Sequence, residues 1–383
     1  MKRKNDFFQG TGAAILIIVL LITVALWAAF NLLRTGDDRV QQRVSVIVED
    51  SNNERWTAFR LGIDQAAAEY GVDVTFVTSN GFSSAEEQKN LIAQEASAGT
   101  DALILSLYDS EETDIVPGTM KLVFVETDGI RYNSAGTAAV IPPGYGMGKA
   151  LGEMMLSDSG LPTSVTASVT ASVTASMTAS EESGGDAAPV SGGQASSGQV
   201  SSSQDSSDPS GKSAGDAASM SSGEAPSVAV LIGNLRRYSQ REILQGLTET
   251  VEAAGGTVWP METEGKELSA VMEKAESCDF IAVLEDTLLV QTASQAVSDD
   301  PVGSRLYGIG CSPSNISYLD RGVISGMVVP NEFSMGYQSL SQLSQCLSND
   351  IPAMKDIEVG FTSVRSEEVH SKANEKLLFL PIR

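Results

Sequence analysis

The chain has 383 residues, enough for two domains, and its 25 basic and 49 acidic side chains give a formal net charge of −24. This charge argues against a nucleic-acid partner, because the phosphates of a nucleic acid require a basic surface. The three cysteines lie far apart and the single histidine, His370, has no motif around it, so the pattern favours neither a zinc site nor a nucleophilic hydrolase. We therefore expect a protein that is not an enzyme and that uses no cofactor or metal.

The N-terminal stretch has the pattern of a membrane anchor. Residues 1–12 contain Lys2, Arg3 and Lys4, and residues 13–33 form an apolar run about as long as a membrane-spanning helix. The basic flank is expected to stay in the cytoplasm, which places the rest of the chain outside the membrane. The prediction is a cytoplasmic tail, a single-pass transmembrane anchor and a polar stalk over residues 34–42. A cleaved signal peptide is the alternative.

The first folded segment reads as a strand, a helix and a second strand. Residues 44–48 are short, apolar and β-branched, and a polar loop over residues 49–54 follows them. A helix with one apolar face then ends at Gly71, and residues 72–77 form the next strand. The residues of that face are Phe59, Ile63, Ala66 and Tyr70. This βαβ pattern predicts a parallel sheet with right-handed crossovers.

The rest of the first half continues the α/β alternation. Ser84 and Glu87 have the spacing of a capping box and predict the start of a helix. Further strands are expected over residues 101–107, 121–125 and 138–141, with a helix over residues 144–155. Residues 157–226 differ from this, because they repeat the unit S-V-T-A and contain almost no large apolar side chain. We predict a disordered insert there, and favour a plain flexible linker over an O-glycosylated one.

The βαβ pattern returns after the insert, over residues 227–265, and Gly246 stands in its helix where Gly62 stands in the first one. Helices are then expected over residues 267–276, 288–297, 316–321 and 333–347, and strands over residues 280–284, 306–309, 323–329 and 357–364. Leu377 to Leu380 are expected to pack back on a domain. The sequence thus predicts two similar open α/β lobes with parallel sheets.

The order of strand, Asn52-Asn53 loop, helix with A-A-A-E-Y-G and second strand resembles the type 1 periplasmic binding proteins. These are the ribose/galactose-binding proteins, related to the effector domains of LacI-type repressors. The resemblance implies that two lobes close on a ligand and are joined by three hinge crossovers, near residues 156–227, 329–331 and 357. Lobe 1 is then expected over residues 43–156 and 331–356, and lobe 2 over residues 227–330 and 357–383.

The resemblance also implies ligand-binding positions, which fall where open α/β sheets bind ligands, beyond the carboxyl ends of the strands. Two alternatives remain open: Trp56 packs on its lobe instead of stacking on a sugar, and Arg241 lies on a solvated helix face. The chain departs from the family at Arg55, Cys311 and Pro330, and at Pro142-Pro143. The implied ligand-binding residues are Asn53, Trp56, Glu126, Asp128, Arg241, Glu285 and Asp286.

The function that follows is that of an extracytoplasmic bacterial solute-binding protein at the cell membrane. It would capture a small polar ligand, a carbohydrate in the first instance, for an ABC transporter permease or for a sensor such as a histidine kinase. The alternative is a surface sensory or interaction module that does not bind sugar and has a protein partner.

Overall fold

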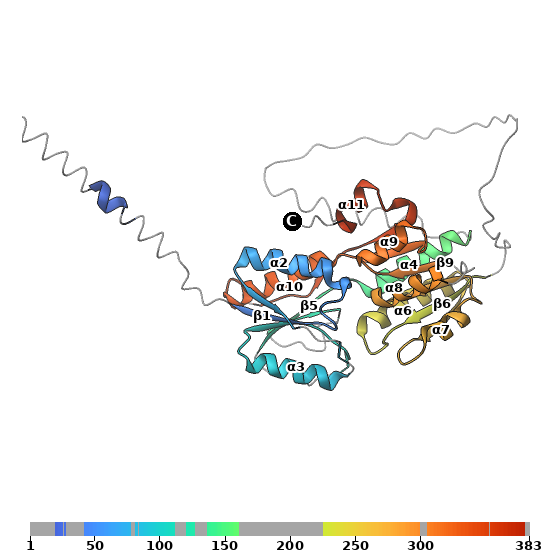
Figure 1. The fold of residues 1–383 in the computed structure, drawn as a ribbon, viewed down its shortest axis with the longest axis horizontal. Coiled ribbons are helices and arrows are strands. Elements are labelled where there is room, and N and C mark those ends of the chain that lie inside the picture. Colours follow the sequence, from blue (N-terminus) through green and yellow to red (C-terminus); the bar gives the residue numbers. More distant parts are fainter. Residues whose placement is uncertain are drawn as a thin grey trace, which may run out of the picture.

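The computed structural model describes residues 20–25, 27, 42–77, 81–82, 84–111, 120–126, 136–160, 225–298, 305–351 and 353–379. Most of them form two α/β lobes, each built on a six-stranded sheet (Figure 1). In both sheets all neighbouring strands run parallel, except for one antiparallel strand at the edge of the second sheet. The predicted fold class of two similar open lobes is confirmed.

Lobe 1 contains the sheet with the order β11-β5-β4-β3-β1-β2. Its strands are β1 (Arg43–Ile47), β2 (Asp73–Phe76), β3 (Ala102–Ser106), β4 (Lys121–Val125), β5 (Thr137–Ile141) and β11 (Ile357–Glu358). Its helices are η1 (Glu54–Trp56), α2 (Thr57–Tyr70), α3 (Ala85–Ser97) and α10 (Glu332–Leu347). The predicted helix boundaries hold, since Ser84 Oγ accepts a hydrogen bond from Glu87 N at 3.3 Å and Gly71 ends α2 at a φ of 69°.

Lobe 2 contains the sheet with the order β12-β10-β9-β8-β6-β7. Its strands are β6 (Ser227–Ile232), β7 (Thr257–Glu262), β8 (Phe280–Val283), β9 (Arg305–Ile309), β10 (Gly326–Pro330) and the antiparallel β12 (Phe361–Arg365). Its helices are α4 (Gly144–Asp158), α6 (Tyr238–Ala253), α7 (Leu268–Ala275), α8 (Asp286–Ser298), α9 (Pro313–Asp320), η3 (Ser366–Glu368) and α11 (Lys372–Leu378). Leu378 is buried in the core of this lobe, as expected for the C-terminal tail.

The first crossover between the lobes lies at Pro142-Pro143, earlier than predicted. Helix α4 follows β5 of lobe 1, but its Met147 and Leu151 are buried in one core cluster with Leu247 of α6. Figure 1 shows α4, in green, among the yellow and orange elements of lobe 2. The prediction placed α4 in lobe 1 because an amphipathic pattern shows that a helix buries one face, but not against which sheet.

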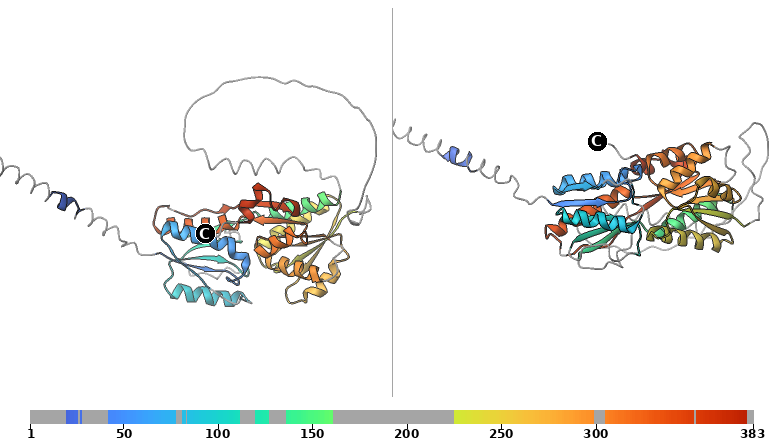
Figure 2. Two further views of the ribbon diagram at one scale, coloured as in Figure 1. Left: turned by 45° about the horizontal axis from the view of Figure 1, so that its top comes forward. Right: turned by 60° about the horizontal axis from the view of Figure 1, so that its bottom comes forward.

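The other two crossovers lie close to their predicted places. The chain leaves lobe 2 after Pro330 and enters α10, which packs on α2 in lobe 1; both views in Figure 2 show this orange-red helix beside the blue one. It returns at Val359-Gly360, between β11 and β12, because the single strand predicted over residues 357–364 is two strands in two sheets.

The described residues on both sides of the predicted insert lie in lobe 2. Residues 161–224 lie outside the described part of the chain, while Gly160 follows α4 and Ala225 precedes β6, both elements of lobe 2. The segment therefore does not replace a hinge crossover, which corrects the expectation of a crossover near residues 156–227. Ser157 and Asp158, predicted to open the insert, are the last residues of α4.

Replacing residues 161–224 by a Gly/Ser linker of about ten residues is expected to leave thermal unfolding cooperative. The composition of the segment predicts a flexible loop, and shortening such a loop this much lowers the entropic cost of closing it, which stabilises the fold by about 1.5 kcal/mol. Differential scanning calorimetry of the purified protein and the variant measures both effects. A broadened transition, or a large loss of unfolding enthalpy, would show that the segment contributes to the folded core.

The predicted membrane anchor is only partly described. Residues 20–25 and 27 are helical and exposed, and the rest of residues 13–33 lies outside the described residues, as do the predicted tail over residues 1–12 and all of the stalk except Gln42. In the parts of the chain that are described, no helix combines the length and the apolar character that a membrane crossing needs.

Each lobe contains a pair of helices in close backbone contact, α2 with α10 in lobe 1 and α4 with α6 in lobe 2. Glycines make the approach possible. A Cβ atom on Gly148 of α4 would overlap the carbonyl oxygen of Ile243 and lie 2.8 Å from its carbonyl carbon, and one on Gly336 of α10 would overlap the carbonyl oxygen of Phe59. Gly62 and Gly246 face the partner backbones in the same way.

Candidate ligand-binding site

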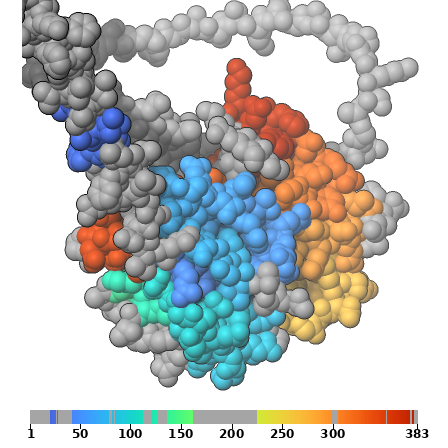
Figure 3. All heavy atoms as spheres, turned by 60° about the vertical axis from the view of Figure 1, so that its left-hand side comes forward, coloured from blue at the N-terminus to red at the C-terminus, as the bar shows by residue number. Residues whose placement is uncertain are grey.

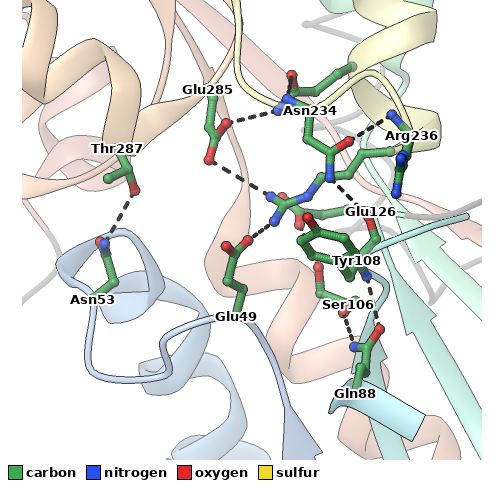
Figure 4. Close-up of polar contacts among 12 residues, drawn as sticks. Glu49, Asn53, Gln88, Ser106, Tyr108, Glu126, Asn234, Arg236, Glu285 and Thr287 are labelled. Carbon is green, nitrogen blue, oxygen red and sulfur yellow. Dashed lines mark hydrogen bonds and ion pairs between the residues drawn. The ribbon is translucent and has the colours of Figure 1, made fainter. Parts of the chain in front are cut away.

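The loops at the carboxyl ends of the two sheets meet between the lobes. Figure 3 shows lobe 1 in front, in blue and cyan, against the orange and yellow surface of lobe 2. The Asn53 side-chain amide donates to Thr287 Oγ1 at 3.2 Å, and the Asn234 amide donates to the Tyr108 carbonyl oxygen at 3.2 Å (Figure 4). The lobes are thus joined by side chains as well as by the hinge.

A second set of bonds extends this contact along the loop after β3. The Tyr108 hydroxyl donates to Glu264 at 2.8 Å, the Ser110 N–H donates to the Arg236 carbonyl oxygen at 3.1 Å, and the Tyr238 N–H donates to Ser110 Oγ at 2.8 Å. Gln88 holds this loop from inside lobe 1, since its amide bonds both the Ser106 carbonyl oxygen and the Tyr108 N–H. Residues 107–111, which follow β3, are therefore held between the two lobes.

Asn53 is the predicted site residue whose position is best explained by local structure. It precedes η1, and its Oδ1 accepts a hydrogen bond from Arg55 N at 3.0 Å, as an N-cap residue does. That bond orients the amide so that Nδ2 points across to Thr287, the second residue of α8 in lobe 2. Asn53 is half-buried and lies at the edge between the lobes, as predicted.

Arg55 occupies the centre of the lobe 1 side of this edge. Its guanidinium forms an ion pair with Glu126 and lies 4.0 Å from Oε1 of Glu332, the first residue of α10. The side chain of Arg55 is only 11% exposed. Sequence reasoning noted Arg55 as a departure from the family and did not assign it to the site.

Glu126 reaches Arg55 through an unusual backbone conformation. It follows β4 with a φ of 61°, in the left-handed region that non-glycine residues rarely adopt. Its second carboxylate oxygen accepts a hydrogen bond from Ser106 Oγ at 2.9 Å. Such strain is typical of functional sites, where the surrounding contacts determine the conformation. Glu126 is therefore held at the predicted place, while Asp128 lies outside the described residues.

The acids around Arg55 shift its pKa and that of Glu332. Burial alone lowers the pKa of Arg55, but the charges of Glu126 and Glu332 raise it above its ordinary value. Burial raises the pKa of Glu332 to about 8, because Arg55 opposes the rise only in part and the carboxylates of Glu126 and Asp286 add to it. Glu332 therefore holds a proton at neutral pH.

The stability of the protein should depend on pH through Glu332. Between the ordinary pKa of 4.5 and about 8, the folded state holds a proton that the unfolded state has released. The free energy of unfolding is then expected to fall by up to about 1.4 kcal/mol per pH unit as the pH rises through this range. Below pH 4.5 both states are protonated and this contribution is fully present.

Urea unfolding of the protein and of Glu332→Gln at pH 5, 6 and 7 gives the free energy of unfolding of each protein as a function of pH. The difference between the two slopes isolates the effect of Glu332. Glutamine keeps the volume of the side chain and cannot ionise. Equal slopes for the two proteins would contradict the shift.

Trp56 packs in the core of lobe 1, which is the alternative to stacking on a sugar. It is 1% exposed, its ring meets that of Phe59 edge-on at 5.4 Å, and its Nε1 donates to the Glu49 carbonyl oxygen at 3.1 Å. The guanidinium of Arg55 lies 4.1 Å over the indole ring. Trp56 thus packs against the guanidinium of Arg55, which covers the face of the indole ring.

Arg237 occupies the centre of the lobe 2 side of the edge. It precedes α6, is 8% exposed, and forms an ion pair with Glu49 of lobe 1. It also lies 3.8 Å from Glu285, whose other oxygen accepts a hydrogen bond from Gln240 at 3.0 Å. Glu49 and Glu285 point toward each other from the two lobes (Figure 4). The predicted residue Glu285 therefore lies at the edge, next to an arginine that was not predicted.

Arg241 lies at the rim instead of the centre. Its Nη1 donates to the carbonyl oxygens of Leu235 and Arg236 at 2.9 Å and 3.0 Å, and Glu111 of lobe 1 is 3.8 Å away. Its side chain is 31% exposed. The structure does not bring it to Arg55, since the arginine four residues earlier takes the central position. The alternative of a partly solvated helix face describes it better.

Asp286 is fixed at the start of α8. Its Oδ2 accepts hydrogen bonds from the N–H groups of Cys311 and Ser312 at 2.6 Å and 2.9 Å, and Asn315 donates to its carbonyl oxygen at 2.8 Å. The thiol of Cys311 contacts the Arg55 carbonyl oxygen at 3.6 Å, and burial raises its pKa well above the ordinary value. Asp286 therefore lies near Arg55, Glu126 and Glu332, which together form the Arg55 cluster, and its role in ligand binding stays a prediction.

Several buried polar atoms at this edge have no hydrogen-bond partner among the described residues. They include both donors and acceptors, and a buried polar group without a partner is costly. The atoms are Ser51 Oγ, Arg55 Nε, Arg237 Nε, Asp286 Oδ1, Asn315 Oδ1 and Glu332 Oε2. This concentration at one edge distinguishes the space between the lobes as the candidate binding site.

Comparison with known proteins agrees with the fold. Residues 44–182 match the family described as the periplasmic binding protein domain. The structure of GanP, a glucose-galactose binding protein from Geobacillus stearothermophilus, superposes with a TM-score of 0.61 at 15% identity, over 87% of this chain and 100% of that one. The chain has the fold of the type 1 periplasmic binding proteins. The predicted resemblance is thereby confirmed.

Two further structures of this fold differ in what accompanies them. A solute-binding protein from Burkholderia graminis, in complex with D-arabinose, has a TM-score of 0.63 at 15% identity over 88% of this chain and 99% of that one. The XylFII-LytSN complex contains a chain with a TM-score of 0.58 at 13% identity, over 86% of this chain and 100% of that one. A search of the curated proteins found no match.

Proposed function

We propose that the chain is a solute-binding protein that captures a small polyhydroxylated ligand, a carbohydrate in the first instance, between its two lobes. The observation that supports it is the set of unpartnered donors and acceptors at the edge between the lobes, among them Arg237 Nε and Asp286 Oδ1. A hydroxyl group both donates and accepts hydrogen bonds, so a polyol can satisfy both kinds of atom.

The proposed binding residues follow from the geometry. The central groups are Arg55, Glu126, Arg237, Asp286 and Glu332, with Asn53 and Glu285 beside them. Asp128 stays a prediction from the resemblance, Trp56 contributes by supporting Arg55, and Arg241 contributes at the rim. A ligand that contacts both lobes binds the closed arrangement more tightly than the open one. Its binding therefore shifts the population toward the closed arrangement.

A thermal-shift screen of the purified protein with mono- and disaccharides tests this function. A ligand at one hundred times its Kd stabilises the folded state by about 2.7 kcal/mol, which raises the melting temperature measurably. Asp286→Asn is expected to reduce the shift, and Glu252→Gln, which removes an exposed charge on α6, is expected to preserve it. If no sugar in the screen raises the melting temperature, the proposed function is wrong.

The second candidate is an interaction or sensory module with a protein partner. An ion pair between the lobes favours this second candidate, because Arg237 of lobe 2 is already bonded to Glu49 of lobe 1. One similar structure is a complex with a second protein. The same screen discriminates between the two functions, because this module would show no sugar-dependent shift.

The cellular setting is part of the proposal. We propose that residues 13–33 anchor the chain in the membrane and that the two lobes lie outside, on the strength of the apolar run and the preceding Lys2-Arg3-Lys4. Delivery to an ABC permease and signalling through a histidine kinase are both open to such a protein. Protease treatment of intact cells tests the topology, and protection of the lobes would refute it.

A further inference from the structure

The edge between the lobes has more acidic than basic side chains. The carboxyl groups of Glu49, Glu126, Glu285, Asp286 and Glu332 meet only the guanidinium groups of Arg55 and Arg237 among the described residues of this edge. Arg55 pairs closely with Glu126, and Arg237 with Glu49. Among the described residues, Asp286 forms no ion pair, and Glu332 has only the long contact with Arg55 at 4.0 Å.

These two acids are buried and incompletely bonded. Asp286 is 7% exposed and Glu332 is 4% exposed. Asp286 uses only Oδ2, for two backbone N–H groups, while its Oδ1 has no hydrogen-bond partner in the described structure. Glu332 Oε1 is 4.0 Å from Arg55, beyond hydrogen-bond distance, and its Oε2 is likewise unpartnered. Each acid therefore has a buried carboxyl oxygen with no hydrogen-bond partner among the described residues.

The two unpartnered oxygens, Asp286 Oδ1 and Glu332 Oε2, belong to side chains whose charges act on each other. The groups that face Glu332 are Arg55 from η1, Glu126 from the end of β4, Asp286 from α8 and Cys311 from the loop after β9. A buried carboxylate requires a cation or a proton. Among the described residues, no three His, Cys, Asp or Glu side chains lie close enough together to hold a metal ion. An ammonium group provides a positive charge and three hydrogen-bond donors, which suits two acceptors that belong to separate acids.

We infer that the ligand carries a protonated amine beside its hydroxyl groups, so that the class of ligand is an amino sugar or a similar amino polyol. This inference rests on the proposed function and deepens it. The amine lies against Asp286 and Glu332, and the hydroxyl groups meet the arginines and Asn53. A neutral sugar of the same shape brings no counter-ion to Asp286 and leaves the proton on Glu332, so it binds more weakly.

Isothermal titration calorimetry with matched pairs of sugars tests the inference. The pairs are D-glucosamine with D-glucose, D-galactosamine with D-galactose and D-mannosamine with D-mannose, all at pH 6.5. At least one amine is expected to bind tenfold or more tightly than its neutral partner. Glu332→Gln is expected to reduce that ratio to below threefold, and the matched control Glu252→Gln, exposed on α6, is expected to keep it.

A proton measurement provides a second readout that needs no variant. Glu332 holds a proton at pH 6.5, and the ammonium group displaces it, so amine binding should release up to one proton per site. Titrations in buffers of different ionisation enthalpy count the protons, and a neutral sugar should release none. If Glu332→Gln fails to fold, this count and Asp286→Asn take its place.

The outcomes separate the inference from the proposed function. Tighter amine binding with proton release supports the inference. Equal or tighter binding of the neutral partners overturns the inference and leaves the proposed function standing. Binding of no sugar from any pair overturns both.

Discussion

Arg55→Leu is expected to lower the free energy of unfolding by about 3–5 kcal/mol, the cost of removing one partner of a buried ion pair. Arg55 is the only described cation close to Glu126 and Glu332, and its guanidinium also covers the ring of Trp56. Leucine fills part of the volume but leaves the largely buried carboxylate of Glu126 without its cationic partner. Urea unfolding at pH 7 measures the loss.

Arg241→Leu is the matched control. Arg241 also lies near an acid, 3.8 Å from Glu111, but at the rim, where its side chain is 31% exposed. Exposed ion pairs contribute about 0.2–1 kcal/mol, so the control should lose little. Similar small losses in both variants would show that the Arg55 cluster does not stabilise the fold.

Gly148→Ala is expected to destabilise the protein by about 3 kcal/mol, at the upper end of the cost of overpacking a core. The added methyl group would overlap the backbone carbonyl of Ile243 and lie 2.9 Å from Leu247 N. Backbone atoms of a helix cannot move aside as a flexible side chain can. The helices α4 and α6 must therefore separate, which disrupts the core of lobe 2 that they share.

Gly146→Ala makes the same change two residues earlier in the same helix. A methyl group there would meet Phe361 at 3.4 Å and Pro143 at 3.6 Å, both ordinary contacts with side chains. Alanine favours a helix over glycine by about 1 kcal/mol, so this variant should be as stable as the original or slightly more so. Equal thermal shifts for the two substitutions would mean that α4 and α6 do not approach through Gly148.

Periodicity was sufficient to predict the elements but not the lobe to which each belongs. The strand and helix patterns of residues 43–81 and 227–265 predicted β1, α2, β2, β6, α6 and the start of β7. Helix α4 was placed on the wrong lobe because Met147 and Leu151 are apolar whichever sheet they cover. The last strand was predicted as one because residues 357–364 contain no strong turn signal beyond Gly360.

The candidate site was predictable to the level of strand ends. Asn53, Glu126, Glu285 and Asp286 all follow strands, and the structure places them together at the edge between the lobes. Arg55, Arg237 and Glu332 were missed, since their roles depend on pairing across long sequence distances. One signal was present for Glu332: it is an acid in the first turn after a hinge crossover, directly beside the sheet edge.

The three crossovers differ in torsional freedom, and this determines how the lobes can move. Proline fixes φ, so the crossovers at Pro142-Pro143 and Pro330 can turn only through their remaining torsions. Pro143 has a φ of −72°. At Gly360 a side chain would meet nothing within 4 Å, and glycine is unrestricted. We therefore expect the lobes to open by rotation about an axis through the two proline crossovers. The crossover at Gly360 would follow this rotation through changes in its own backbone torsions.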